Sequence, residues 1–273
     1  MTAKAAKFRR QMRMHYRTHG RDLPWRHTHD PYRILVSEFM LQQTQVVRVL
    51  TYYPRFLKQF PTPASLARAP LRDVLRAWQG LGYNRRALHL KQTATLIIKK
   101  YHGKIPRDFH TLQTFPGVGQ STAGALMAFA FNAPMPFIET NIRRVYIHHF
   151  FGKKKGVSDA AILTLVEKTL DRKDPRAWYY ALMDYGAHLG TMEENPNTRS
   201  KHYKKQSPFS GSNREIRSRI LRELLDAKTA YQEHLVARLD ITHDALSYAL
   251  DSLIKDRFIR THRGRITLAS LPI

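Results

Sequence analysis

Two glutamates in this chain lie where a carboxyl group could transfer a proton or stabilise a positive charge. Glu38 is the only acidic residue between Asp30 and Asp73, and it lies in an apolar helical stretch. Burial in such surroundings raises a carboxyl pKa, so the group can hold a proton near neutral pH and act as a general acid. The alternative is a glutamate on a helix surface. Glu139 directly precedes a predicted helix, where it is either an N-cap or a second functional carboxylate.

A glycine turn between two predicted helices is a candidate phosphate-binding site. Gly117 and Gly119 follow a proline, and a helix is expected to begin at Gln120 or Ser121. Backbone N–H groups at such a helix start bind anions, and glycine lets a phosphate approach closely. The longer pattern L-x-x-F-P-G-V-G-x-x-T-A, residues 112–123, resembles the helix-hairpin-helix of DNA glycosylases and endonucleases.

The charge of the chain favours a polyanionic partner over the alternative, a merely solvated surface. The 273 residues include 46 Lys and Arg against 21 Asp and Glu, a net charge of +25. Nucleic acid is expected rather than a membrane, because no single helix joins a basic face to a bulky apolar one. No apolar run suits a membrane span or a secretory signal. We therefore expect an intracellular, DNA-associated protein of the cytoplasm or nucleoid.

Cysteine is absent from the chain. This excludes disulfides, thiolate nucleophiles and cysteine-ligated zinc or iron–sulfur clusters. The 14 histidines show no zinc-binding spacing, so no catalytic metal is expected.

Helices must position these groups. Apolar residues recur three and four positions apart from residue 6 to about 190, with short Pro and Gly breaks, which predicts an all-α core. A polar stretch follows and is interpreted as a linker. Beyond it come three helical patterns, at 214–227, 230–239 and 244–256, and then an alternating hairpin tail around Gly264. This order is typical of a winged helix-turn-helix, whose middle helices could address a DNA groove. The alternative is a small helical bundle that packs on the core.

Six ordered blocks together resemble the MutY-type adenine DNA glycosylases of the helix-hairpin-helix (HhH-GPD) superfamily. They are LPWR (23–26), PYRILVSEFMLQQTQV (31–46), WQGLGYNRRALHL (78–90), FPGVGQSTAGA (115–125), FIETNIRRV (137–145) and ALMDYGAHLG (181–190). The resemblance covers nearly all of residues 20–190. It implies a two-lobed core over 1–198, with a hairpin-containing lobe at about 25–133 and a second lobe of 1–24 plus 134–198. A linker at 199–213 and a winged-helix-like domain at 214–273 would follow.

The resemblance implies a monofunctional glycosylase that hydrolyses adenine mispaired with 8-oxoguanine or guanine. Glu38 would protonate N7 of the extruded base. Glu139 stands where the family has an aspartate that stabilises the sugar oxocarbenium ion and directs the nucleophile. Its extra methylene matters, since misplacement by about 1 Å can cost ~100-fold in rate. Ser121 occupies the position of the Schiff-base lysine of bifunctional relatives, so no AP lyase activity is expected. Lys91 and Lys99 are expected to face solvent.

The resemblance also assigns residues to DNA recognition. The loop that intrudes at the lesion would comprise Gln42, Gln43 and Thr44, and Tyr83 would wedge beside the orphaned guanine. The adenine pocket would be lined by Trp25, Arg26, Leu41 and Asp184. Core packing is the alternative for Trp25, Leu41 and Tyr83. DNA contacts are expected at the hairpin residues Gly117, Gly119, Gln120 and Ser121, and candidate phosphate contacts at Arg85, Arg86, Arg143 and Arg144.

Besides Glu139, the chain departs from the family in its cluster segment and in its C-terminal domain. Most relatives continue after ALMDYGA with four cysteines that hold a [4Fe–4S] cluster, whereas Gly190 stands at the first of these positions here. No cluster is therefore expected, and its DNA-positioning role would pass to the basic residues Arg199, Lys201, Lys204 and Lys205. A monovalent cation on backbone carbonyls of 113–119 remains compatible with the sequence. Typical relatives end in a NUDIX-like domain that reads 8-oxoguanine, so the opposite base is open.

Two rival functions follow from the same residues. One is excision of thymine or uracil from G:T or G:U mismatches by the same fold. The other is a DNA-binding protein whose catalysis is impaired by the change to Glu139. In each case the expected partner is double-stranded DNA with a mispaired or damaged base, bound by a monomer and away from membranes.

Overall fold

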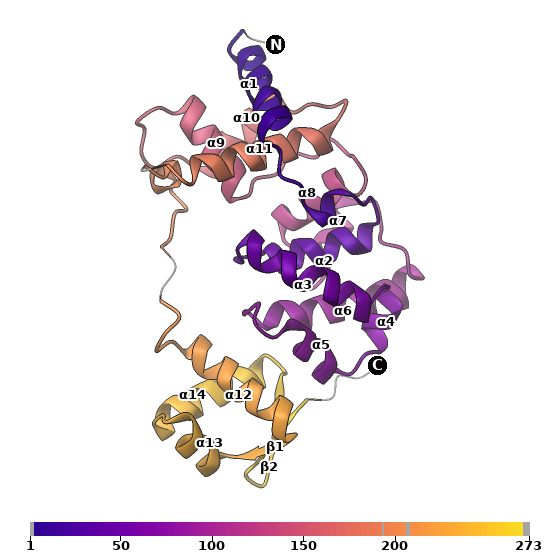
Figure 1. Cartoon of the computed structure of the whole chain (residues 1–273), viewed down its shortest axis with the longest axis vertical. Helices are drawn as coiled ribbons and strands as arrows, with labels where there is room; N and C mark the ends of the chain where they lie inside the picture. The colour runs from indigo at the N-terminus through magenta and orange to yellow at the C-terminus, as the bar shows by residue number, and fades with distance from the viewer. Residues whose placement is uncertain (1–2, 193, 206–207, 270–273) are drawn as a thin grey trace. The chain divides into compact units, whose positions relative to one another are not determined.

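A computed structural model describes residues 3–192, 194–205 and 208–269 of the chain (Figure 1). Contacts between Cα atoms divide the chain into two compact units, Met1–Glu38 with Pro106–Lys205 and Phe39–Ile105 with Gln206–Ile273. None of the helices in the described ranges has both the length and the apolar character needed to span a membrane. The domain bounds expected from the sequence stay a prediction, because clusters of contacts do not report which segments fold alone.

The first unit is built from helices. They are α1 (Ala3–His19), α7 (Phe109–Gln113), α8 (Gln120–Phe129), α9 (Thr140–Phe150), α10 (Asp159–Thr169) and α11 (Pro175–Leu189), with the short 3-10 helices η1 (Pro24–Arg26) and η2 (Pro196–Arg199). Helix α2 (Pro31–Leu41) begins in this unit and ends in the other.

Helix α11 lies at the centre of the first unit and packs against α9, α1 and α8 (Figure 1). It begins at Pro175, after Asp174 caps it by accepting a hydrogen bond from the Ala177 N–H at 3.2 Å. Proline suits this position because its missing N–H has no partner inside the helix. The α9 contact is close: a Cβ added at Gly186 would lie 2.4 Å from the carbonyl oxygen of Asn141. This packing fixes the start of α9, where Glu139 lies.

The second unit joins a helical layer to the C-terminal elements. The helices of the layer are α3 (Val46–Gln59), α4 (Pro63–Arg68), α5 (Leu71–Trp78) and α6 (Arg85–Tyr101). The C-terminal elements are α12 (Asn213–Ala227), β1 (Thr229–Tyr231), α13 (Gln232–Leu239), α14 (His243–Lys255), β2 (Ile259–His262) and β3 (Arg265–Leu268). Buried Trp78 and Phe56 meet edge to face, with ring centroids 5.7 Å apart.

Helix α12 is bonded to the layer. Arg72 and Arg76 of α5 donate hydrogen bonds to the carbonyl oxygens of Leu224 and Leu225, at 3.0 and 2.8 Å. These carbonyls belong to the last turn of α12, where helix carbonyls have no partner within the helix.

The C-terminal sheet has the order β1-β3-β2, and both pairs are antiparallel. An all-α core followed by a small domain with a β-hairpin is confirmed, and the hairpin lies where Gly264 predicted it. Strand β1 was not predicted: residues 230 and 231 were expected to begin a helix. Buried Ala230 instead pairs with buried Ile266 of β3.

Candidate active site and DNA-binding interface

Helix α2 holds Glu38 in an environment from which water is mostly excluded. Its neighbours on this helix are buried: Ile34, Leu35, Val36, Ser37, Phe39 and Met40. The Glu38 side chain keeps partial access to the surface. Burial, with the negative charge of Glu139 as a second cause, raises the pKa of Glu38 to about 8. Such a carboxyl is mostly protonated at neutral pH, as a general acid must be.

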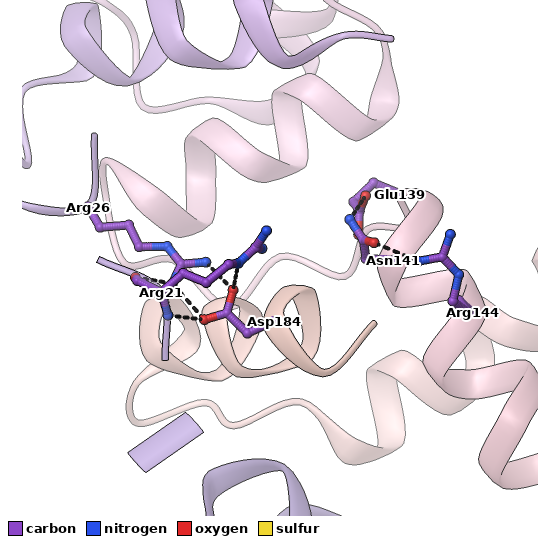
Figure 2. Close-up of polar contacts among 6 residues, drawn as sticks. All are labelled: Arg21, Arg26, Glu139, Asn141, Arg144 and Asp184. Atoms are coloured by element: carbon purple, nitrogen blue, oxygen red, sulfur yellow. Dashed lines mark hydrogen bonds and ion pairs between the residues drawn. The ribbon is translucent and has the colours of Figure 1, made fainter. Parts of the chain in front are cut away.

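Glu139 is the N-cap of α9. One carboxylate oxygen accepts a hydrogen bond from the Ile142 N–H at 2.7 Å, and the other accepts one from the side-chain amide of Asn141 at 3.2 Å (Figure 2). Burial raises the pKa of Glu139, whereas the bonds at the helix start and the charges of Arg143 and Arg144 act in the opposite direction. The N-cap expected from the sequence is confirmed, and the role of Glu139 as a second functional carboxylate stays a prediction.

Arg144 supports this cap from one turn further along α9. It donates a hydrogen bond to the side-chain oxygen of Asn141 at 3.0 Å, so Asn141 links Arg144 to Glu139 (Figure 2). The guanidinium also donates to the Gly186 carbonyl at 2.5 Å and to the side-chain oxygen of Asn195 at 3.1 Å. Arg144 was a candidate phosphate contact, but most of its donors bond within the first unit.

Asp184 of α11 is buried between two arginines. Arg26 donates two hydrogen bonds to its carboxylate at 2.8 and 2.7 Å, and Arg21 donates from its backbone at 2.9 Å and its side chain at 2.6 Å (Figure 2). Burial favours a higher pKa for Asp184, but these bonds and charges outweigh it and hold the pKa below its ordinary value. The ionised carboxylate therefore fixes Arg26, next to buried Trp25. The adenine-pocket roles of these residues stay predictions.

The glycine turn joins α7 to α8, as the sequence predicted. Gly117 has φ +76°, in the left-handed region that favours glycine. Gly119 is the N-cap of α8, no side chain caps this helix start, and a Cβ added there would meet nothing within 4 Å. Gln120 is exposed and Ser121 is partly buried in the first turn. Accessible N–H groups at a helix start suit a phosphate. Phosphate binding at this turn, and a cation on carbonyls of 113–119, stay predictions.

Four residues assigned to the lesion line one cleft of about 930 Å³ in the second unit: Gln42, Gln43, Thr44 and Tyr83. Gln43 and Tyr83 both have left-handed backbones, with φ of +54° and +48°. Leu41, the last residue of α2, is partly buried. The cleft supports the expected grouping of the intruding loop with the wedge residue, and their roles on DNA stay predictions.

Arg86 corrects one prediction, because it is buried rather than available to phosphate. Its guanidinium donates to the carbonyls of Phe39, Met40 and Gln42 at 2.6–2.9 Å. It also bonds the carbonyls of the loop that precedes Tyr83, those of Leu81 and Gly82, and the hydroxyl of Thr44. Burial lowers the pKa of Arg86 to about 10. Arg86 therefore ties both cleft-lining segments together.

Lys91 and Lys99 were both predicted to face solvent, and this is confirmed for Lys99 and wrong for Lys91. Lys99 is exposed as expected, but Lys91 is buried and donates a hydrogen bond of 2.6 Å to the carbonyl of Ala67. That carbonyl belongs to the last turn of α4, so Lys91 satisfies a helix end.

The segment after α11 is held by hydrogen bonds. Asn197 donates from its side-chain amide to the Thr140 carbonyl at 3.0 Å, and Asn195 accepts from Arg144. The backbone pairs with Val157, whose N–H donates to the Arg199 carbonyl at 3.0 Å. The chain has no cysteine, so the donor set of a four-cysteine cluster is missing and these residues do not fit one. No group of three or more His, Asp or Glu in the described ranges is placed to hold a metal.

Exposed basic side chains of the C-terminal elements lie on the hairpin of β2 and β3 and also on α12 and at the end of α14. Arg260, Arg263 and Arg265 are exposed on the hairpin. The exposed side chains of α14 include Asp244 and Asp251. DNA contact by the hairpin or by the middle helices stays a prediction.

The remaining arginines named in the sequence already have partners. Arg143 forms a two-pronged ion pair with Asp159, both contacts at 2.8 Å, and exposed Arg85 lies 3.7 Å from Asp256. Phosphate contact by either stays a prediction.

Sequence reasoning missed Arg21, Asn141 and Asn195. The only available signal was for Asn141, a polar residue two positions after the capping glutamate. Arg21 and Asn195 meet partners that lie 163 and 51 residues away, so no local spacing could reveal them.

Known proteins match this chain in sequence and in fold. Residues 36–169 match the HhH-GPD superfamily of base excision DNA repair proteins. The adenine DNA glycosylase of Mycobacterium tuberculosis is 35% identical over 93% of this chain and 90% of its own length. The enzyme of that name from Mycolicibacterium smegmatis is also 35% identical, over 91% of this chain and 92% of its own length.

Solved structures agree. A thermostable thymine-DNA glycosylase matches with a TM-score of 0.66 and 28% identity, covering 71% of this chain and 90% of that one. Endonuclease III, trapped as a covalent DNA intermediate, shares the fold with a TM-score of 0.54 and 23% identity, covering 77% of this chain and 92% of that one. Identity that spans nine-tenths of both sequences, together with the match to the superfamily model, shows that the chain belongs to the adenine DNA glycosylases of the HhH-GPD base excision repair superfamily.

Proposed function

We propose that this protein hydrolyses the N-glycosidic bond of adenine mispaired with 8-oxoguanine or guanine in DNA. The observation that carries the proposal is the pair of Glu38 and Glu139. One carboxyl has a pKa of about 8, and the other is held by two hydrogen bonds at a helix start. Two carboxyl groups with different environments can divide the roles of acid and charge stabiliser.

In the proposed reaction, Glu38 donates its proton to N7 of an extruded adenine, which turns the base into a neutral leaving group. The bond between C1′ and N9 breaks, and positive charge develops on C1′ and the ring oxygen of the sugar. The Glu139 carboxylate stabilises that charge. A water oxygen then bonds to C1′ as Glu139 takes a proton from the water, and solvent returns this proton to Glu38. The products are free adenine and an abasic site.

The rest of the molecule would hold the DNA in a form that permits this reaction. We assign backbone phosphates to the first turn of α8, at Gly119, Gln120 and Ser121, and duplex intrusion to Gln42, Gln43 and Thr44. Extrusion of a base costs a few kcal/mol of stacking, which inserted side chains offset. The protein would act as a monomer, and sedimentation of the protein alone and with one lesion duplex tests that stoichiometry.

The reaction should stop at the abasic site. A β-elimination lyase needs an amine nucleophile, and Ser121 offers a hydroxyl at the hairpin. Lys91 is committed to a backbone carbonyl. Borohydride treatment during turnover should therefore trap no protein–DNA adduct. Strand cleavage without alkali, together with a trapped adduct, would contradict this part of the proposal.

Single-turnover base release tests the main proposal and its rivals together. Duplexes carrying 8-oxoguanine:A, G:A, G:T and G:U are each incubated with excess protein and then treated with alkali to reveal abasic sites. Release from the two adenine duplexes alone is the expected result. Release from G:T or G:U instead would favour a thymine or uracil glycosylase, an activity class that one structural neighbour represents by its name.

A second arm of the same experiment distinguishes a DNA-binding protein without catalysis from an active glycosylase. Such a protein would hold the adenine duplexes tightly and release no base. If Glu139→Asp then restored release, the loss would lie in the position of this carboxylate. If Glu38→Gln released adenine at the parental rate, Glu38 would not be the acid.

A further inference from the structure

The cleft of the second unit has one wall contributed by the C-terminal elements. The segments at 42–48 and 79–89 form one side. Helix α12 contributes residues to the lining that include Arg214, Arg217 and Arg222. The proposed wedge residue therefore shares a cleft with a helix that belongs to the winged-helix-like part of the chain.

The backbone of Tyr83 is fixed in an uncommon conformation. Its φ is +48°, directly after Gly82 at +71°. Left-handed backbones are rare for residues other than glycine and need support from their surroundings. Arg86 supplies that support: its N–H donates to the Tyr83 carbonyl at 2.9 Å, and its guanidinium lies 5.5 Å from the ring centroid. The side chain of Tyr83 thus leaves a rigid point in the chain.

The far end of the tyrosine is held by α12. Arg214 donates a hydrogen bond of 2.6 Å to the phenol oxygen, and its guanidinium lies 5.5 Å from the ring centroid. Arg214 is itself oriented by a second bond, to the carbonyl of Pro208 at 3.2 Å. The last turn of α12 is bonded to α5 by Arg72 and Arg76. Tyr83 is therefore held at its backbone by Arg86 and at its hydroxyl by Arg214.

We propose that Arg214 is a positioning residue that fixes the Tyr83 phenol against an unpaired base in the cleft, so that the C-terminal elements control base extrusion through this contact. The inference rests on the proposed function, because its ligand is a DNA strand with an unpaired base. An aromatic ring stacks on a base of any sequence, and a neighbouring guanidinium restricts the ring through a cation–π contact. Through this contact, elements outside the unit that contains Glu38 and Glu139 would act on base release.

A measurement without DNA tests the contact itself. 3-Fluorotyrosine placed at position 83 gives one 19F resonance in the full-length protein. Arg214→Ala should shift or broaden that resonance, and Arg214→Lys, which keeps a cationic donor group, should change it less. Arg222→Ala is the matched control, since it removes a charge from the same helix and the same cleft and should leave the resonance in place. An unchanged resonance in Arg214→Ala would overturn the proposal whatever the protein does to DNA.

A double-mutant cycle then tests the consequence on DNA. The loss of one charge-assisted hydrogen bond predicts about a tenfold slower single-turnover adenine release in Arg214→Ala. In a Tyr83→Phe background the same change should alter the rate less than about twofold, because the partner is already gone. Arg214→Lys should recover part of the rate. Equal losses in both backgrounds would show that Arg214 acts independently of Tyr83 and would overturn the proposal.

Failure of the proposed function would look different. If the parent protein releases no adenine from any duplex, 2-aminopurine at the target position still reports extrusion by its fluorescence. Arg214→Ala should then lower the fluorescence that is reached at saturating protein. Arg222→Ala should reach the parental fluorescence and change only the protein concentration needed to saturate the duplex. Equal fluorescence at saturation in parent and Arg214→Ala would reject the inference.

Discussion

The side-chain amide of Asn197 donates a hydrogen bond of 3.0 Å to the carbonyl of Thr140, the first residue of the helix that Glu139 caps. Asn197 is buried, and Asn195 in the same segment accepts a hydrogen bond from Arg144. Asn195 and Asn197 thus attach the segment that follows α11 to the first turns of α9. The position of the Glu139 carboxylate depends on residues that lie more than fifty positions away in sequence.

Removal of this hydrogen bond should weaken both stability and catalysis. Asn197→Ala removes this bond while the Thr140 carbonyl keeps its bond within the helix, so the expected cost is about 0.5–1.5 kcal/mol of unfolding free energy. Thermal unfolding and single-turnover release measure the two effects. Thr198→Ala is the control, because Thr198 is exposed and bonds only locally, to the Asn195 carbonyl. Equal behaviour of the two variants would contradict the role given to Asn197.

Glu38 predicts a pH profile for base release. With a pKa of about 8, its proton is present at neutral pH and is lost as the pH rises through that value. The rate should therefore fall above pH 8, by about tenfold per unit at the limit. Glu38→Gln should be slow, by ~10²–10⁴-fold, and flat with pH over the same range. A parental rate that stays constant up to pH 10 would exclude Glu38 as the acid.

The same raised pKa predicts a change in stability. Between the ordinary carboxyl value of 4.5 and about 8, the folded state holds a proton that the unfolded state has released. The contribution of Glu38 to stability is therefore complete below pH 4.5 and is lost as the pH rises toward 8. In denaturant unfolding, the free energy of unfolding of Glu38→Gln should rise relative to that of the parent protein from pH 5 to pH 8. A constant difference between the two would contradict the raised pKa.

Variants of Glu139 should separate the effect of its N-cap hydrogen bond on α9 from the effect of its negative charge on base release. Glu139→Gln keeps an oxygen that can accept the Ile142 N–H but loses the negative charge, so helix α9 should stay capped while base release slows by ~10²–10³-fold. Glu139→Asp keeps both the charge and a preferred N-cap side chain, so its rate should stay above that of Glu139→Gln. Single-turnover rates and far-ultraviolet circular dichroism measure the two properties. A Gln variant as fast as the parent would leave Glu139 as a cap alone.

Asp184 predicts a large loss of stability on neutralisation. Its side chain and that of Arg26 are 1% and 7% exposed, so Asp184→Asn leaves a buried guanidinium uncompensated, at a cost of roughly 3–5 kcal/mol. Asp22→Asn is the matched control. Asp22 pairs with His27 at the surface, with side chains 86% and 69% exposed, and such pairs contribute little. Chemical denaturation compares them, and similar midpoints for both variants would be inconsistent with a buried ion pair.

The exposed arginines of the hairpin should make a salt-dependent contribution to DNA affinity. Arg263→Ala and Arg265→Ala should each weaken binding at low salt and reduce the log–log salt slope by about 0.9 for every phosphate that the variant no longer neutralises. Lys255→Ala, an exposed cation at the end of α14, should leave the slope unchanged. Fluorescence anisotropy across a salt series measures both. A slope that responds to Lys255 and not to the hairpin would place the DNA on α14 instead.

Features encoded in short contiguous patterns were predictable from the sequence. The helix periodicity predicted the all-α core, the glycine turn predicted the α7–α8 hairpin, and Gly264 predicted the hairpin of β2 and β3. Glu38 and Glu139 stood out because few acidic residues surround them. Each of these signals depends on residues that are neighbours in the chain, where spacing alone fixes the geometry.

Features that depend on distant partners were not predictable. Strand β1 is short, and its pairing with β3 joins residues more than thirty positions apart. Lys91 and Arg86 resembled solvated charges, but each is buried because backbone carbonyls from other segments accept its hydrogen bonds. An arginine in a sequence does not reveal whether it will meet phosphate or carbonyl oxygen, since both accept the same donors.

The bonds of Arg86 hold two cleft-lining segments in place in the free protein. A loop that is flexible in the free protein loses conformational entropy on binding, and this loss subtracts from affinity. Here the carbonyls of Gln42, Leu81 and Gly82 already share one guanidinium before any DNA arrives. In the proposed function, these segments would therefore lose little conformational entropy on binding DNA, and less of the interaction energy would be spent on ordering them.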